Sequence, residues 1–444
     1  MKILFRENKK SDVKLIITDK WEGMKLKPLE YKIFGNVYVI NFDDDSTKLE
    51  FSLWSIRKIQ LAKANSISIE WKLPYNETRC RILFELLYAN YSITYTNKKS
   101  DVKPNLNVFL NPKVKCKNLI DIAIIYQTIE LAKQLSDSDP VTDGTPFALS
   151  NTFKKLLTRE KIKVDILNKQ QIKCEKLNLF LKVNQGSQRE PYLVVAKYLG
   201  NRQDKHTTLL IGKGITFDTG GINLKKEMND MRLDKCGGCD VLCVLIALAK
   251  LKVKVNVIAV VGFTDNIIGE SSVLPSSVIK TRDNISVQID STDAEGRLTL
   301  ADMISYGIEK FHPHEIIEIS TLTGSIAISL GKYMTGCWSN DLQFANYFKS
   351  LSDVVGDEIW IMPMHRINDM AVRSAELADI TNAPNKNKYG SSSSAAAFLN
   401  VFVNNQSKFI HLDIGATGIE KNRATGVMIK GLINYFVTKG QKYA

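Results

Sequence analysis

Five charged side chains between residues 211 and 297 stand in Gly-rich stretches beside apolar runs, where a charge is normally unwelcome. Four are the carboxylates Asp218, Asp234, Asp293 and Glu295, and the fifth is Lys213. Carboxylates brought together by the fold repel one another and raise one another's pKa unless cations lie between them. A set without His or Cys suits hard divalent ions such as Mn²⁺ or Mg²⁺, and Zn²⁺ also accepts carboxylate. The sequence therefore predicts a metal site.

Simpler interpretations exist for each residue taken alone. A lone Asp is usually a solvated loop carboxylate or a helix cap, and Asp293 could cap a helix beginning near Arg297. Lys213 can bind a metal only as the neutral amine, because an ammonium has no lone pair. The alternative for Lys213 is a salt bridge to one of the carboxylates. Four carboxylates interleaved with basic residues favour the metal site over these alternatives.

Strands and helices alternate from about residue 147 onward. Such alternation predicts a mostly parallel sheet covered by helices on both faces, and ligands bind such sheets beyond the carboxyl ends of the strands. Asp218, Asp293 and Thr321 each follow a predicted strand, so we expect them to lie close together. The predicted strands are 177–183, 192–198, 207–211, 255–262, 315–320 and 409–414. The predicted helices are 151–160, 238–251, 297–311, 394–403 and 426–437, with a hairpin around Asp283-Asn284.

The sequence indicates an α/β protein of two domains. Residues 1–118 form a smaller N-terminal α/β domain, with strands expected at 13–17, 37–42 and 91–95 and a helix at 79–87. Residues 119–146 form a linking helix (119–135) and a turn-rich break (137–146). Residues 147–444 form the larger C-terminal domain, which carries the candidate metal site and so is expected to be catalytic, with the mostly parallel central sheet flanked by helices.

Composition indicates where the protein is located more than what it does. The first residues lack the apolar region of a signal peptide, and lysines interrupt the longest apolar tract, 241–263, so we expect a cytoplasmic protein without a membrane span. Seven scattered cysteines fit a reducing compartment, and Cys236, Cys239 and Cys243 are interpreted as small helix-packing side chains. The net charge of +13 leaves DNA binding possible, but no run of five or more basic residues occurs, so DNA binding is not favoured.

Several sequence blocks together resemble one family. They are GKGITFDTGG (212–221), MRLDKCGG (231–238), STDAEGRLTLAD (291–302) and STLTGS (320–325), followed by ELADITN (376–382), SAAAFL (394–399) and HLDI (411–414). Their types and order resemble the leucyl aminopeptidase (cytosol aminopeptidase) family of binuclear metallopeptidases, over roughly the last two thirds of the chain. One departure is the segment between Lys225 and Asp234, which is shorter than is usual in that family.

The resemblance implies roles for the charged residues. Asp218 and Glu295 would bridge two divalent ions, with Lys213 and Asp234 completing the tighter site and Asp293 the more exchangeable one. Lys225 would stabilise the oxyanion, and its neighbour Lys226 is the alternative. Arg297 would hold a bicarbonate that acts as general base, because its fork suits a planar anion. For both basic residues, a plain charge-balancing role remains open.

The resemblance also implies a substrate pocket and an assembly. Met231, Thr321, Leu322 and Gly324 would line the pocket for the first side chain, although Met231 could equally be core. An apolar pocket favours leucine-like N-terminal residues. We expect release of such residues from short peptides with a free N-terminus, by a homohexamer. The alternatives are a basic DNA-binding homologue and a non-catalytic homologue of the same fold.

Overall fold

The computed structural model describes residues 2–4, 13–17, 20–21, 24–25, 31–34, 37–40, 66–71, 107–110, 119–384 and 389–442. The chain divides into two compact units, Met1–Glu130 and Leu131–Ala444, and the division falls inside helix α3 (Leu119–Ser136). The predicted helix 79–87 and strand 91–95 lie outside the described residues. None of the described helices is long and apolar enough to cross a membrane.

The first unit contains a six-stranded sheet with the order β1-β8-β7-β2-β6-β5. Neighbouring strands run parallel except the antiparallel pair β5 and β6. The predicted strand 13–17 is confirmed as β2, and the strand predicted at 37–42 is β6, which ends two residues earlier. The strands are β1 (Lys2–Leu4), β2 (Val13–Ile17), β5 (Tyr31–Phe34), β6 (Val37–Ile40), β7 (Ser66–Trp71) and β8 (Asn107–Leu110), with a small ribbon of β3 (Lys20–Trp21) and β4 (Met24–Lys25).

The second unit is built on an eight-stranded sheet with the order β17-β16-β19-β15-β11-β12-β10-β9. Its central strands β19, β15, β11 and β12 are parallel, and antiparallel pairs occur toward both edges. The predicted mixed α/β class with a large, mostly parallel sheet is therefore confirmed. The strands are β9 (Lys163–Leu167), β10 (Tyr192–Leu199), β11 (Thr207–Asp218), β12 (Asn256–Asn266), β15 (Glu315–Ser320), β16 (Thr335–Ser339), β17 (Ile359–Ile361) and β19 (Lys408–Asp413).

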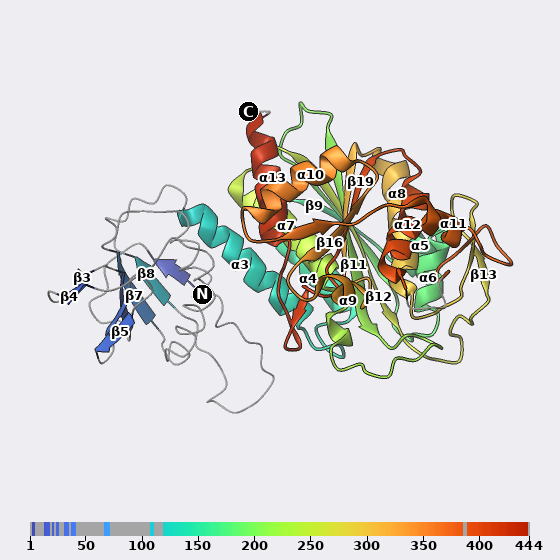
Figure 1. The fold of residues 1–444 in the computed structure, drawn as a ribbon, viewed down its shortest axis with the longest axis horizontal. Coiled ribbons are helices and arrows are strands. Elements are labelled where there is room, and N and C mark those ends of the chain that lie inside the picture. Colours follow the sequence, from blue (N-terminus) through green and yellow to red (C-terminus); the bar gives the residue numbers. More distant parts are fainter. Residues whose placement is uncertain are drawn as a thin grey trace. The chain divides into compact units, whose positions relative to one another are not determined.

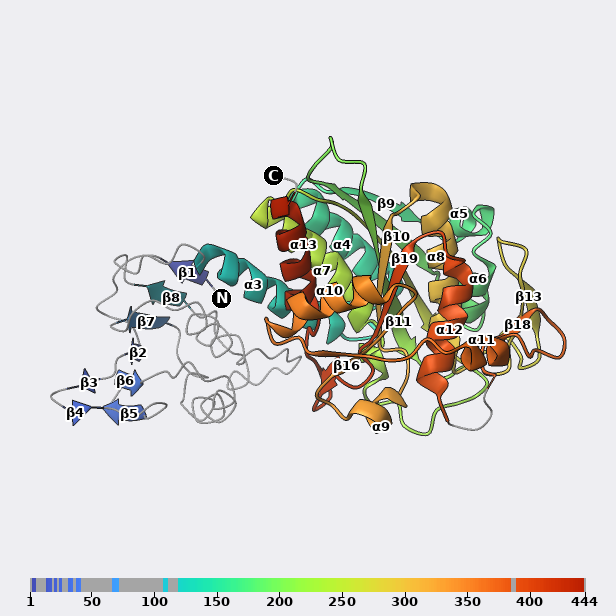
Figure 2. The ribbon, with the colours of Figure 1, turned by 45° about the horizontal axis from the view of Figure 1, so that its top comes forward.

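Helices cover both faces of this sheet (Figures 1 and 2). One layer contains α4 (Pro146–Arg159), α7 (Cys236–Leu251), α10 (Leu342–Asp353) and α13 (Ile429–Lys442). The other contains α5 (Lys169–Cys174), α6 (Asn178–Asn184), α8 (Glu295–Phe311), α11 (Arg366–Val372) and α12 (Ser391–Val403). Smaller elements are β13 (Val278–Lys280), β14 (Ser286–Gln288), α9 (Ile326–Leu330), β18 (Ile380–Thr381), β20 (Ile419–Glu420) and β21 (Arg423–Ala424).

Most predicted elements of this unit are present, with shifted ends. The hairpin predicted around Asp283-Asn284 is the antiparallel pair β13 and β14, and Asn284 adopts a left-handed φ of 64° in its turn. Strand β11 is longer than predicted and reaches Asp218, so the GKG segment is strand rather than turn. This happens because β12 and β15 both pair with β11 through Gly212 and hold it extended. Lys213 is therefore placed by the sheet itself.

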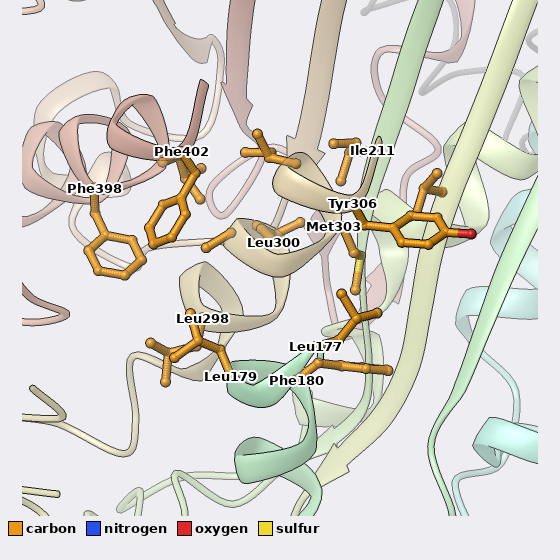
Figure 3. Packing of buried hydrophobic residues seen from close by; sticks show 14 of the residues in the cluster. Leu177, Leu179, Phe180, Ile211, Leu298, Leu300, Met303, Tyr306, Phe398 and Phe402 are labelled. Carbon is orange, nitrogen blue, oxygen red and sulfur yellow. The ribbon is translucent and has the colours of Figure 1, made fainter. Parts of the chain in front are cut away.

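A large hydrophobic core lies between the sheet and the layer of α6, α8 and α12 (Figure 3). Leu300 and Met303 from α8 meet Phe180 from α6 and Ile211 from β11, and all four side chains are completely buried. α8 is therefore fixed along its length against the sheet. Because α8 begins at Glu295, this packing also fixes one of the predicted metal ligands.

The predicted strand at 177–183 is wrong, because this segment forms helix α6. Leu179, Phe180 and Val183 are buried and share one helical face, a spacing that fits helix better than strand. The helix has no side-chain cap of its own, and Asp302 of α8 accepts a hydrogen bond of 2.9 Å from the backbone N–H of Phe180. A residue more than a hundred positions away therefore caps it, which local sequence could not reveal.

Asp302 generates a prediction about pH. Burial raises the pKa of this carboxyl to about 8, against the lowering effect of the Phe180 and Leu179 N–H groups. The folded protein keeps a proton that the unfolded chain loses above pH ~4, so stability falls between pH ~4 and ~8. Asp302→Asn keeps an acceptor for Phe180 without a charge. The free energy of unfolding in urea, taken as variant minus wild type, should be at least about 1 kcal/mol higher at pH 9 than at pH 5.

The exposed acid Asp369, whose side chain is 49% exposed, provides the control. Asp369→Asn should show no such gain between the same two pH values. An Asp302→Asn variant whose stability relative to wild type is the same at pH 5 and pH 9 would contradict the assignment.

Candidate metal centre

Segments far apart in the sequence meet at the carboxyl end of the central strands. β11 carries Lys213 and ends at Asp218, Asp234 follows the 3₁₀ turn η3 (Met231–Leu233), and α8 begins at Glu295. Carboxylate oxygens of Asp218, Asp234 and Glu295 all lie within 4.8 Å of one another, and the three side chains are buried. Among the described residues this is the one group of His, Cys, Asp or Glu side chains arranged to hold an ion.

Lys213 lies inside this group as its counter-ion. Its Nζ is 2.7 Å from Oδ2 of Asp234 and 2.9 Å from Oε1 of Glu295. The same ammonium donates a hydrogen bond of 3.2 Å to the carbonyl of Thr321. These contacts are those of the salt-bridge alternative, and a role as metal ligand would require the amine to give up its proton.

Lys225 connects the buried group to Asp293. Its Nζ lies 2.8 Å from Oδ2 of Asp218 and 2.5 Å from Oδ1 of Asp293, which is the most exposed of the four carboxylates. The neighbouring Lys226 is exposed, so the structure favours Lys225 over Lys226. The shortened segment before Asp234 thus still brings Lys225 to the site. Asp293 does not cap α8, whose N-cap is Ala294 without a side-chain hydrogen bond.

The carboxylates strongly perturb one another. The pKa of Asp218 is raised to about 8, first by burial and then by the carboxylates of Glu295 and Asp234. Burial also raises the pKa of Asp234 to about 6, although Lys213 counteracts it. Burial opposes ionisation of Glu295 as well, but Lys213 and Lys225 outweigh it and hold the pKa of this carboxyl below its usual value. The helix N-terminus further favours a carboxylate at this position.

Both lysines remain protonated in this surrounding. Burial alone would lower the pKa of Lys213, but the carboxylates of Asp234 and Glu295 outweigh it and raise the pKa. Burial likewise opposes the charge of Lys225, and Asp218 leads the carboxylates that raise its pKa. Two ammonium groups therefore balance part of the negative charge of four carboxylates.

The donor set fits a hard divalent cation. Oε2 of Glu295 is buried, and no residue in the described part of the chain donates a hydrogen bond to it. The other carboxylates are oriented from outside the group: Thr321 Oγ1 donates to Asp234 at 2.7 Å, and Asn266 Nδ2 donates to Asp218 at 2.7 Å. Such outer hydrogen bonds commonly orient metal ligands. Carboxylates in this arrangement offer the oxygen ligands that Mn²⁺ and Mg²⁺ prefer.

Glycines let the backbone approach closely enough to form the group. A Cβ on Gly237 would lie 2.0 Å from the carbonyl oxygen of Ile319, so this glycine lets the start of α7 rest on β15. A Cβ on Gly296 would lie 2.5 Å from Cε of Lys213. Gly220, with φ of +85°, turns the chain after Asp218 in a conformation that L side chains rarely adopt. A larger residue at any of these glycines would therefore clash with a neighbouring element or strain the turn.

Arg297 is buried in the first turn of α8, with 7% of its surface exposed. Its Nη1 donates a hydrogen bond of 2.7 Å to the carbonyl of Asn382, whereas its Nε finds no acceptor among the residues that the structure describes. Burial lowers the pKa of Arg297 to about 10, against the carboxylates of Glu295 and Asp413. It therefore stays cationic at neutral pH and keeps a donor available for a planar anion.

The predicted pocket residues are placed unequally. Thr321 directly contacts Lys213 and Asp234, as described above, and a terminal carbon of Leu322 lies 3.0 Å from where a Cβ on Gly296 would be. Gly324 is exposed and faces open space. Met231 is half-buried in the turn that leads to Asp234. Thr321 and Leu322 are thus next to the acidic group. Met231 and Gly324 lie in the same turns as Asp234 and Thr321, a few residues along the chain.

Thr292 and Asn223 join the two loops that carry the acidic residues, and the sequence analysis did not single them out. Thr292 donates through Oγ1 to the carbonyl of Gly220 at 2.7 Å, and its backbone N–H donates to Oδ1 of Asn223 at 2.8 Å. Asn266 adds a hydrogen bond of 3.1 Å to the carbonyl of Thr292. All three lie in or beside quoted motifs or predicted strands, but only the tertiary structure shows which loop each one holds.

Comparison with known proteins gives a family match and several similar relatives. Residues 130–433 match the family model described as "Cytosol aminopeptidase family, catalytic domain". The chain is 32% identical over 359 residues to the cytosol aminopeptidase of Rickettsia prowazekii (strain Madrid E), covering 80% of this chain and 71% of that protein. It is 33% identical over 359 residues to a probable cytosol aminopeptidase of Rickettsia typhi (strain ATCC VR-144 / Wilmington), with the same coverage of both proteins.

The fold, the acidic group and these matches define a peptide hydrolase of the metallo-aminopeptidase class. The chain belongs to the cytosol aminopeptidase family. The resemblance drawn from the sequence motifs is therefore confirmed.

A substitution at Gly296 tests the steric part of this description. In Gly296→Ala the new Cβ would collide with the end of the Lys213 side chain, which would have to shift from its place beside Asp234 and Glu295. We expect metal retention, measured by elemental analysis after dialysis, to fall by at least about tenfold. Gly307→Ala in the same helix is the control, because its Cβ would collide with Leu209 in the core instead.

Both alanines should destabilise the protein, by about 1 to 3 kcal/mol each, because both overpack a filled space. Only the substitution at Gly296 should reduce metal content. Equal metal content in the two variants would show that the approach of Lys213 to α8 is unimportant for the site.

Proposed function

We propose that the chain is a leucyl-type aminopeptidase that releases leucine-like N-terminal residues from short peptides with the help of two divalent ions. The observation that carries the proposal is the buried group of Asp218, Asp234 and Glu295 with Lys213 among them. These residues and Asp293 would hold the ions, which are Mn²⁺ or Zn²⁺, or else Mg²⁺. Bound ions of this kind polarise a scissile carbonyl and lower the pKa of the attacking water.

Lys225 supplies the stabilising charge for the oxyanion in this proposal. It is partly accessible, with 21% of its side chain exposed, and its raised pKa keeps it cationic. Its present partners, Asp218 and Asp293, are both proposed ligands, so ion binding would compete for their oxygens and free the ammonium for the substrate. A fixed cation beside the developing negative charge favours the transition state over the ground state.

Arg297 would hold a bicarbonate through its unused Nε, and that anion would accept the proton of the attacking water. Thr321 and Leu322 would line the pocket for the first side chain, together with Met231 and Gly324. An apolar pocket discriminates only modestly between apolar side chains. The leucine preference is therefore a preference among similar residues rather than an exclusive choice.

The proposal extends to organisation and setting. We propose the domain division 1–118, 119–146 and 147–444, a homohexamer, and action in the cytoplasm. The name of the relatives, cytosol aminopeptidase, supports the last of these. The DNA-binding and non-catalytic alternatives receive no specific support from the site, whose lysines are engaged with carboxylates.

Substrate chemistry provides the first test. Leucine should be released from leucine amide in the presence of Mn²⁺ or Zn²⁺, and a chelator should abolish this release because the carboxylate group alone cannot polarise the carbonyl. N-acetyl-leucine amide should remain uncleaved, because the proposed enzyme requires a free α-amine. Cleavage of the acetylated compound at a comparable rate would contradict the aminopeptidase assignment, and DNA retention that weakens steeply with salt would favour the binding alternative.

Two glutamates at opposite ends of α8 provide a matched pair of variants. Glu295→Ala should reduce release of leucine by at least about 100-fold, since even outer partners of metal ligands are worth about 10- to 100-fold. Glu309→Ala removes an exposed carboxylate at the far end of α8 whose partner is Arg282 and not a residue of the acidic group, so its activity should match wild type. Wild-type-like activity of Glu295→Ala would refute its role.

A further inference from the structure

Asn382 is a fully buried polar residue that the proposed chemistry does not use. It follows β18, which pairs in parallel with β14, and its backbone N–H continues that pairing with a hydrogen bond of 3.1 Å to the carbonyl of Gln288. It is the last residue of the motif ELADITN. Its side chain points to the loop that links β14 to α8, and this loop carries Asp293 and leads directly into Glu295.

Both the oxygen and the nitrogen of the Asn382 side chain make hydrogen bonds to that loop. Oδ1 accepts hydrogen bonds from the backbone N–H groups of Asp290, at 2.9 Å, and Ser291, at 3.3 Å. Nδ2 donates to the carbonyls of Ser291, at 2.7 Å, and Ala294, at 3.3 Å. The amide therefore holds the loop at both of its ends.

The loop contains no helix or strand between residues 289 and 294; Thr292 is tied at its centre, and Asn382 holds the residues on either side. Ala294 is the N-cap of α8 and makes no side-chain cap hydrogen bond. Ala294 is also the residue between Asp293 and Glu295, so a shift of its carbonyl moves two proposed ligands together. A carboxamide offers donors and an acceptor in one rigid plane, which neither a carboxylate nor an aliphatic side chain of similar size can do.

The side chain and the main chain of Asn382 serve different residues. The side chain holds the loop, whereas the carbonyl oxygen accepts the hydrogen bond from Nη1 of Arg297. A side-chain substitution therefore disturbs the ligand loop and leaves the acceptor for Arg297 in the chain. This separation allows the effect on metal binding to be distinguished from an effect on the arginine.

We propose that Asn382 is a positioning residue for the metal centre: its carboxamide fixes the 290–294 loop so that Asp293 and Glu295 are arranged for ions before these bind. It touches neither substrate nor reacting atoms. The inference rests on the proposed function, because it assumes that these two carboxylates are metal ligands. Its expected signature is weakened metal binding, with catalysis largely recovered when metal is in excess.

The test compares two asparagines that each clamp a loop. Asn256 is a matched control: it is 5% exposed, and its side chain makes hydrogen bonds of 2.7, 2.8 and 3.1 Å to the loop 201–204, away from the acidic group. Asn382→Leu and Asn256→Leu would be stripped with a chelator and titrated with Mn²⁺ by calorimetry. Leucine is similar in size and removes every side-chain hydrogen bond without adding a charge.

We expect Asn382→Leu to bind Mn²⁺ about 10- to 100-fold more weakly than wild type in at least one step. Its kcat for leucine amide should return to within about threefold of wild type at saturating Mn²⁺, because the catalytic groups are unchanged. Asn256→Leu should lose stability but keep wild-type affinity. If Asn382→Leu does not fold, Asn382→Ser is measured by the same criteria.

Equal Mn²⁺ affinity in the Asn382 and Asn256 variants would overturn the inference while leaving the proposed function intact. A kcat of Asn382→Leu that stays low in excess Mn²⁺ would also overturn it, since the defect would then lie beyond metal binding. Failure of the wild-type protein itself to bind Mn²⁺ or Zn²⁺ would instead refute the proposed function, and the inference with it.

Discussion

Mutual repulsion among buried carboxylates is the constraint on which the second unit depends. Asp218, Asp234 and Glu295 are within a few ångströms of one another in a place where water cannot screen their charges. Such a group is stable only with cations between or beside its members. Lys213 and Lys225 meet this need in part, and burial together with the remaining repulsion from Glu295 and Asp234 still raises the pKa of Asp218. The site is therefore held in a state that favours the binding of further positive charge.

The fold supports this group by fixing each ligand through a different element. The sheet fixes Lys213 and Asp218, the start of α7 fixes the turn with Asp234, and the packed helix α8 fixes Glu295. Close backbone approaches at glycine make these positions compatible. The loops between the elements are then tied by amides and hydroxyls, so the polar interior is ordered by hydrogen bonds rather than by burial alone.

The sequence predicted the acidic group well because its residues stand in short motifs whose spacing is local. It predicted the alternating architecture for the same reason, since hydrophobic periodicity is a local signal. It failed at 177–183, where the buried residues have helical spacing but the segment is short and its cap comes from Asp302 in a distant helix. It also missed the roles of Thr292 and Asn382. Their partners lie up to about ninety residues away, and no local pattern reveals such contacts.

The account rests on the claim that the carboxylate group binds divalent ions, and anomalous diffraction tests this claim most directly. A crystal of the full chain grown with Mn²⁺ would be measured at a wavelength where manganese scatters anomalously. The account predicts anomalous peaks bordered by Asp218, Asp234 and Glu295, with Nζ of Lys213 withdrawn from its carboxylate partners. Refined coordinates in which Lys213 still bridges Asp234 and Glu295, with no anomalous peak beside them, would contradict it.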